Sequence, residues 1–227
     1  MFWDQSLTQL FLKGGFAMWP LLVCNIVGVA ITMERVIFFF RLRFDYDKFA
    51  SELKALLAKK NYKDAVAMCK RSANPVASVA ENYLRNLDHD EVRDDVLKRI
   101  GSLALEKVEA HLRTLASITH ISPLLGLLGT VTGLVSAFHR IEMLGGQVQP
   151  GDLAAGIWEA LITTVFGLVI AIPSMAAYHG FETIADRIAR RMQFIVSELD
   201  EFFGKRSSGK FVAADVQSTE QDMKAMH

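Results

Sequence analysis

Three long apolar stretches, separated by charged sequence, constrain the fold of this chain more than any other feature. They cover residues 15–40, 118–138 and 153–178. Each can cross the roughly 30 Å hydrocarbon core of a bilayer, which takes about 20 helical residues. Buried strands of soluble proteins have shorter apolar runs, of about 4–8 residues. The pattern therefore predicts an all-α membrane protein with three transmembrane helices.

The charged sequence between the first two stretches, residues 41–113, predicts a soluble bundle of short helices. We expect a helix over residues 51–60 and a second one, Ala65–Lys70, introduced by Asn61. Asn74 followed by Pro75 predicts an N-cap and a proline at the first helical position of a third helix. These helices are too few to form a large core alone, which favours assembly with other copies of the chain.

The second and third transmembrane helices are predicted to be long and to extend into the cytoplasmic helical bundle. From Glu91 to Phe138 apolar residues recur at helical spacing, so one unbroken helix is expected there, capped by Asp88 or Asp90. The third helix is expected to begin after an N-cap at Asp152 and to reach about Phe203. Its last part has an apolar face formed by Phe181, Ile184, Ile188, Met192, Ile195 and Leu199.

Basic residues beside the spans predict the orientation of the chain, because cytoplasmic flanks carry an excess of Lys and Arg. One set of flanks is rich in such residues, whereas the opposite ends hold only Lys13 and Arg140. Trp3, Trp19 and Trp158 fall at the same predicted outer interface, where tryptophan is enriched. The N-terminus is therefore expected outside and the C-terminus in the cytoplasm. The basic flanks contain Arg41, Arg43, Lys48, Lys98, Arg99, Lys107, Arg113, Arg187, Arg190 and Arg191.

The predicted organisation has eight segments along the chain. They are an outer-face amphipathic helix, a first transmembrane helix, a cytoplasmic helical segment, a second transmembrane helix, an outer loop, a third transmembrane helix, a cytoplasmic helix and a disordered tail. In that order they cover residues 1–14, 15–40, 41–113, 114–139, 140–152, 153–178, 179–204 and 205–227.

Charge and motif content argue against several classes of function. The 227 residues carry 25 Lys and Arg against 25 Asp and Glu, so the charge balance gives no support for a nucleic-acid partner. The sequence has no His-Glu-x-x-His, no phosphate-binding glycine loop, no Cys pair at metal spacing and no nucleophile elbow. We therefore expect no enzyme activity, cofactor or metal. Cys24 lies in the first apolar stretch and Cys69 in the charged segment, so we expect two unpaired thiols.

Small and polar residues form one face of the second span and one face of the third, because they recur three or four residues apart. The spacing leaves two explanations open: close helix packing, as in Gly129-x-x-x-Gly133, or a polar pathway. Thr130 and Thr164 each lie about 12 Å inside the predicted outer ends, and hydroxyls at matched depth suit proton relay. The faces comprise Thr119, Pro123, Gly126, Thr130, Gly133 and Ala137, and Gly156, Ala160, Thr164, Gly167, Ala171 and Ser174.

Charged residues within the spans are candidate functional residues. Glu159 lies in the third apolar stretch, and an intramembrane acid is costly unless it has a function. It lies only about 5 Å from the predicted outer end, so snorkelling to the interface is the alternative. Thr163 is one turn away on nearly the same side, whereas Thr164 is rotated from Glu159 by about 140°. Glu34 and Arg35 are predicted to form an interfacial charge pair.

Three sequence motifs resemble those of a known membrane family. The first is Met18-Trp19-Pro20-Leu21 followed by Met33-Glu34-Arg35, and the second is the run from Ser122 to Leu134. The third runs from Gly156 through Glu159, Thr164 and Gly167 to Pro173. Over residues 10–205 the chain resembles the MotA/TolQ/ExbB proton channel family, and its three spans match ExbB and TolQ better than the four-span MotA.

The resemblance implies a function, a set of partners and a set of site residues. It implies the channel or stator subunit of an inner-membrane motor driven by the proton motive force, which energises envelope transport or integrity. The family forms a homopentamer in membrane lipid around a dimer of a single-span ExbD/TolR-like partner, whose aspartate takes and releases the proton. Thr130 and Thr164 correspond to the pore-lining threonines, and Glu159 to the intramembrane acid. Supporting positions are Thr163, Pro123, Gly126, Gly133, Gly167 and Pro173.

Two departures and two alternatives accompany this resemblance. Trp158 precedes the acid where family members often have a small residue, and Thr163 adds a hydroxyl, so the choice between proton and sodium stays open. One alternative function is the stator of a gliding or flagellar motility machine. The other is a passive membrane scaffold, in which the small residues serve only helix packing.

Overall fold

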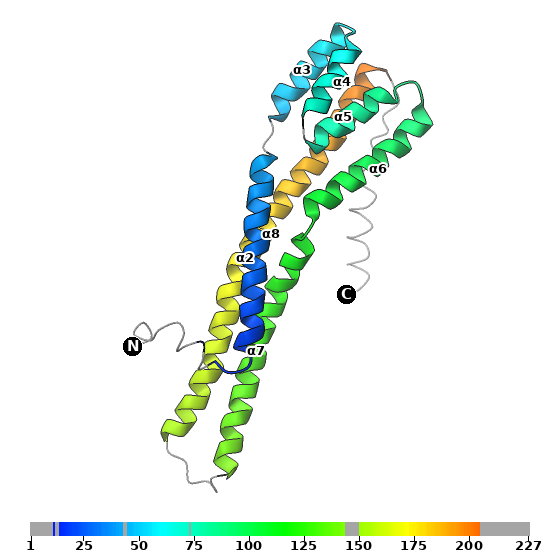
Figure 1. Cartoon of the computed structure of the whole chain (residues 1–227). Coiled ribbons are helices and arrows are strands. Elements are labelled where there is room, and N and C mark those ends of the chain that lie inside the picture. Colours follow the sequence, from blue (N-terminus) through cyan, green and yellow to red (C-terminus); the bar gives the residue numbers. More distant parts are fainter. Residues whose placement is uncertain (1–10, 12–13, 43–44, 73, 144–149, 205–227) are drawn as a thin grey trace. The chain divides into compact units, whose positions relative to one another are not determined.

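The computed structural model describes residues 11, 14–42, 45–72, 74–143 and 150–204, with the backbone alone at residues 90–91, 150–153, 155 and 159 (Figure 1). These residues form helices joined by turns, with no strand among them. The predicted N-terminal helix, apart from Phe11 and Gly14, and the predicted tail lie outside the described residues. The helices are α2 (Met18–Arg41), α3 (Tyr46–Ala58), α4 (Tyr62–Arg71), α5 (Pro75–Arg85), α6 (Asp90–Glu109), α7 (Leu112–Met143) and α8 (Pro150–Phe202).

The chain divides into two compact units. The first comprises Met1–Ile37 and His111–Phe181, and the second comprises Phe38–Ala110 and Glu182–His227. Helix α8 contributes to both, because its backbone continues through Phe181 and Glu182 without a break.

In the first unit, α2 lies beside α7 and the first part of α8 (Figure 1). Met18 and Leu21 of α2 form a buried cluster with Ile118 of α7 and Ile170 of α8. Each of the three helices belongs to a helical stretch long and apolar enough to cross a membrane. The prediction of an all-α chain with three such helices, the second and third of them long, is therefore confirmed.

In the second unit, side chains cap the short helices. Asp45 Oδ1 accepts the Lys48 amide at 3.2 Å, so α3 begins at Tyr46, earlier than expected. Asn61 accepts the Asp64 amide at 3.4 Å, and Asn74 accepts the Val76 amide at 2.9 Å. The predicted caps at Asn61 and at Asn74-Pro75 are confirmed.

The prediction of one unbroken helix from Glu91 to Phe138 is wrong. Helix α6 ends at Glu109 and α7 begins at Leu112. Between them His111 has a φ of +63°, in the left-handed region that interrupts a right-handed helix. The histidine carbonyl then accepts the Leu115 amide at 3.0 Å, which starts the next helix.

Two predicted N-caps are also wrong. His89 occupies the N-cap of α6 and makes no side-chain capping bond, so neither Asp88 nor Asp90 has that position. Helix α8 begins at Pro150, two residues before Asp152. Proline suits a first helical position because the N–H it lacks would have no partner there.

The end of α8 packs into the second unit through the predicted apolar face. Of its six residues, Ile184 is exposed and the others are buried. Near the end of the helix the hydroxyl of Tyr83, in α5, donates to Asp200 Oδ1 at 2.6 Å. Arg93 of α6 lies over the Tyr83 ring, 4.7 Å from its centre. Three helices therefore meet at one buried polar cluster.

Candidate functional site

Helices α7 and α8 pack against each other in antiparallel fashion along a seam of small residues. A β-carbon at Gly126 would lie 3.0 Å from the Thr163 carbonyl oxygen and from Thr164 Cα. One at Gly133 would lie 3.1 Å from Ala160 Cβ, and one at Gly167 would lie 2.6 Å from the Ser122 carbonyl oxygen. Side chains at these glycines would push the helices apart, so the small residues serve close packing within one chain.

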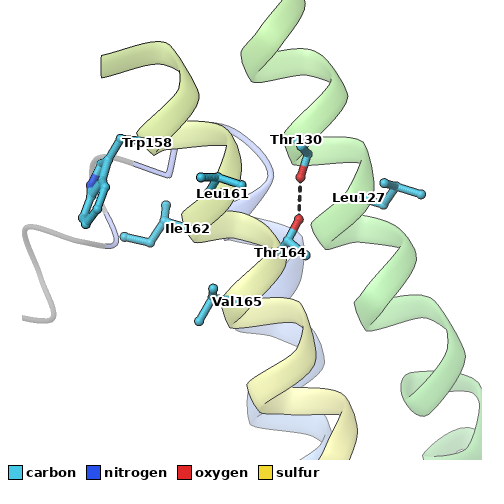
Figure 2. A pocket seen from close by; sticks show the side chains of 7 residues that line it. All are labelled: Leu127, Thr130, Trp158, Leu161, Ile162, Thr164 and Val165. Carbon is cyan, nitrogen blue, oxygen red and sulfur yellow. Dashed lines mark hydrogen bonds between the residues drawn. The ribbon is translucent and has the colours of Figure 1, made fainter. Parts of the chain in front are cut away.

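Thr130 of α7 and Thr164 of α8 lie opposite each other at the edge of this seam. Their hydroxyls hydrogen-bond to each other, and Figure 2 shows them pointing toward one another between the two helices. Both side chains are half-buried. The two hydroxyls therefore lie at the same level of the helix pair, and their depth in a membrane stays a prediction.

The Gly126 carbonyl is the centre of the hydroxyl cluster. It lies 3.2 Å from Thr130 Oγ1, 3.1 Å from Thr164 Oγ1 and 3.3 Å from Thr163 Oγ1. The Ala160 carbonyl accepts at 2.7 Å from Thr163 and lies 3.2 Å from Thr130 Oγ1. Three hydroxyls and two carbonyl oxygens are thus collected in one place.

A groove of about 510 Å³ runs beside the hydroxyl pair. Its wall is apolar except for the two threonines and the indole of Trp158 (Figure 2). In such surroundings the hydroxyls are the groups best able to bind water or pass a proton, because they both donate and accept. The lining residues are Leu127, Thr130, Trp158, Leu161, Ile162, Thr164 and Val165.

The buried face of α7 differs in phase from the predicted stripe. Ser122 and Gly129 are buried in the seam, whereas Pro123 and Thr130 lie at its edge. Among the described residues the Ser122 hydroxyl has no hydrogen-bond partner. Ser122 is not among the residues expected at the site, although its spacing of seven residues from Gly129 places both on one helix face.

On α8 four of the six residues of the predicted stripe are buried, and Gly156 and Thr164 are half-buried. Gly167, Ala171 and Ser174 are buried, and Thr163, which the stripe did not include, is only 1% exposed. Pro173 lies within the helix, as predicted. Glu159 stands one turn before Thr163 on the α8 backbone, and its side chain is outside the described residues.

The Glu34–Arg35 ion pair is present in α2. Arg35 Nε lies 2.6 Å from Glu34 Oε2, and Arg35 Nη2 lies 2.8 Å from Glu34 Oε1. His111 Nδ1 lies 3.4 Å from the same carboxylate. The paired geometry is bidentate, the stronger arrangement for Arg and a carboxylate. Its location at a membrane interface stays a prediction.

Comparison with known proteins identifies the family. Residues 71–194, more than half of the chain, match the MotA/TolQ/ExbB proton channel family. The chain belongs to this family. The family consists of proton channels rather than a known class of enzyme, and with three apolar helices the chain is a multi-pass inner-membrane protein. Among the described residues, no three His, Cys, Asp or Glu side chains form a metal site.

Named relatives are similar to the chain over different lengths. The biopolymer transport protein exbB1 of Vibrio cholerae is 31% identical over 196 residues, which covers 83% of this chain and 85% of that protein. The Tol-Pal system protein TolQ of Pseudomonas aeruginosa is 32% identical over 123 residues, 53% of each chain. The biopolymer transport protein ExbB of Xanthomonas campestris is 29% identical over 122 residues, which covers 54% of this chain and 48% of that protein.

Proposed function

We propose that this proton-channel-family chain is the channel subunit of an inner-membrane motor driven by the proton motive force. The motor energises transport across the envelope, or envelope integrity, through a single-span ExbD/TolR-like partner. The hydrogen-bonded pair of Thr130 and Thr164, on the wall of an otherwise apolar groove, is the observation that carries this proposal. Membership of the family and the names of the relatives support it.

The proposed assembly is a homopentamer around a dimer of the partner. The faces of α7 and α8 that point away from the seam are apolar and exposed in the single chain, so lipid or neighbouring helices must cover them. The groove at Thr130 and Thr164 is one such surface. The exposed apolar residues are Ile121, Leu124, Leu127, Leu128, Val131, Val135, Phe138, Ile157, Trp158, Leu161, Val165, Leu168, Val169, Ile172 and Met175.

The proposed orientation follows the distribution of basic residues. The N-terminus and the sequence joining α7 to α8 face outward, and α3 to α6 with the end of α8 lie in the cytoplasm. We propose the same order of membrane, outer and cytoplasmic segments as the sequence predicts. The helices in them begin and end where the structure places them.

In the proposed mechanism a proton enters from outside and reaches the partner's aspartate beside Thr130 and Thr164. Neutralising that carboxylate removes a charge that is costly in lipid, and its later release to the cytoplasm restores the charge. The two hydroxyls hand the proton on because each can accept one hydrogen bond while donating another. Glu159, one turn from Thr163, attracts the incoming cation.

A passive membrane scaffold is the second candidate function. It is favoured by the seam, in which Gly126, Gly133 and Gly167 allow close packing within one chain. A scaffold needs neither a titratable group in the span nor a proton-carrying partner. The two functions therefore predict different responses to a change at Glu159.

Two measurements test the proposal. The first is purification of the full chain from membranes of its native host, and the second is proton flow in the variant Glu159→Gln. A motor subunit should co-purify with a one-span protein that has an aspartate in its span. Glu159→Gln should abolish proton flow out of inverted vesicles, whereas the exposed Glu142→Gln should not. Absence of such a partner, together with wild-type behaviour of Glu159→Gln, would leave the scaffold as the better account.

A further inference from the structure

The Thr163 hydroxyl is buried beside the Thr130–Thr164 pair without belonging to it. The residue is 1% exposed. Its hydroxyl donates to the Ala160 carbonyl at 2.7 Å and lies 3.3 Å from the Gly126 carbonyl. Gly129 faces it, and a β-carbon there would lie 2.5 Å from Thr163 Oγ1, so the seam has room for this hydroxyl only opposite glycine.

The hydroxyls of Thr130, Thr163 and Thr164 share a limited number of acceptor positions on the neighbouring carbonyl oxygens. A carbonyl oxygen has two lone pairs. Because Gly126 and Ala160 lie within α-helices, one lone pair of each accepts the amide four residues on, from Thr130 and Thr164. Each carbonyl therefore has one lone pair left for a hydroxyl. Three hydroxyl protons compete for two such positions.

The shortest hydroxyl–carbonyl contact shows which hydroxyl donates to the Ala160 carbonyl. Thr163 occupies the Ala160 carbonyl at 2.7 Å, while Thr130 lies 3.2 Å from the same oxygen. One of Thr130 and Thr164 can then donate to the Gly126 carbonyl, which lies 3.2 Å and 3.1 Å away. The remaining proton must point to the other hydroxyl. The pair is bonded in either of two directions, and both use every proton.

Removing the Thr163 hydroxyl changes the count. Thr130 can then donate to the Ala160 carbonyl and Thr164 to the Gly126 carbonyl. Both protons are satisfied separately, and no proton is left for the bond between the two hydroxyls. The direct bond between the two hydroxyls is then lost, and each hydroxyl bonds instead to a carbonyl of the opposite helix.

We propose that Thr163 is a positioning residue, which occupies the Ala160 carbonyl and so forces Thr130 and Thr164 to hydrogen-bond to each other in two interchangeable directions. The inference rests on the proposed function, because a relay needs hydroxyls whose donor direction reverses as each proton passes. The described geometry of the pair depends on Thr163 whether or not protons flow there.

Solid-state NMR of the full chain in bilayers, with ¹H–¹H correlation between the Thr130 and Thr164 hydroxyls, tests the geometry. The correlation should be lost in Thr163→Ala and Thr163→Val and kept in Thr163→Ser. Thr132→Ala is the matched control, because Thr132 is exposed and its hydroxyl donates to the Leu128 carbonyl oxygen of its own helix at 3.0 Å. A correlation that survives in Thr163→Ala, or one that Thr163→Ser loses while Thr132→Ala keeps it, overturns the inference. If Thr163→Val does not fold, Thr163→Ala decides.

Proton flow out of inverted vesicles of the native host tests the consequence. Thr163→Ala should reduce the flow about fivefold, which corresponds to the net free energy of one hydrogen bond. Thr163→Ser should restore the flow. Unchanged flow in Thr163→Ala, with the NMR correlation lost, overturns the positioning role. If flow instead survives removal of Thr130 and Thr164, the proposed function fails, and the NMR result still decides the effect of Thr163 on the pair.

Discussion

Gly126 combines two properties at the scale of a single residue. Its lack of a side chain lets the α8 backbone approach closely, and its carbonyl lies within 3.3 Å of three threonine hydroxyls. A larger residue would lose both at once, since the helices would separate and the hydroxyl cluster would open. Close helix packing and a polar pathway, the two explanations of the small residues, therefore both depend on Gly126.

Gly126→Ala should destabilise the chain by about 1–3 kcal/mol, because the new methyl group would meet backbone atoms that cannot move aside. Gly180→Ala is the matched control, since a β-carbon at Gly180 meets no atom of the described part of the chain within 4 Å. It should stabilise the helix by about 1 kcal/mol. Thermal unfolding in detergent measures both. Equal effects of the two substitutions would contradict the close approach at Gly126.

Cys69 should be an unreactive thiol in the folded chain. Burial, with a smaller contribution from Glu81, raises the pKa of Cys69 from 9.0 to about 12. The folded state thus holds this proton more tightly, so the stability contribution is full below about pH 9 and declines as the pH rises toward 12.

At pH 8 the native thiolate fraction should be roughly a thousandfold below that of the unfolded chain. In a Cys24→Ala background, alkylation of Cys69 by iodoacetamide should be correspondingly slow until denaturant is added. Equal rates in the folded and unfolded chain would show that the thiol is accessible.

At the scale of helices, the phase of the buried face was the part that sequence could not determine. In α7 the positions Ser122 and Pro123, and likewise Gly129 and Thr130, are adjacent, so either member of each pair fits a spacing of three or four. Only the partner helix decides which one is buried, and α8 presents Thr163 opposite Gly129. The meeting of the two hydroxyls at one level of the helix pair was predictable, because the rise per residue is fixed.

The breaks between helices were predictable only where the side chain is the cause. Asn61 and Asn74 cap by their own oxygens, and the sequence identifies them. His111 carries no such signature, since its left-handed conformation comes from the surrounding structure. The sequence therefore predicts one helix where the structure has α6 and α7.

The turn from α3 to α4 provides a test of backbone strain. Lys60 has a φ of +54°, and the following amide of Asn61 bonds back to the Leu56 carbonyl at 3.1 Å. Lys60→Gly should stabilise the chain by about 1 kcal/mol, because glycine adopts this conformation without a steric cost. Lys59, with a φ of −82°, is the control, and Lys59→Gly should not stabilise. Chemical denaturation distinguishes them, and a gain from Lys59→Gly alone would contradict the assignment.

At the scale of the whole molecule, the two units differ in what their surfaces require. The first presents apolar side chains on α2, α7 and α8 that need lipid or other helices around them. The second has its own core, with Leu53, Tyr83 and Ile195 almost fully buried. The chain belongs to a family of proton channels. The proposed proton pathway depends on Thr130 and Thr164, which lie in the first unit.

Proton flow through Thr130→Ala/Thr164→Ala tests that dependence most directly. The measurement uses inverted membrane vesicles of the native host, with the assembly of each variant checked on a native gel and Thr132→Ala as the control. The account predicts that the double variant assembles like the wild type but conducts no protons, whereas Thr132→Ala conducts normally. Wild-type proton flow in a correctly assembled double variant would contradict it.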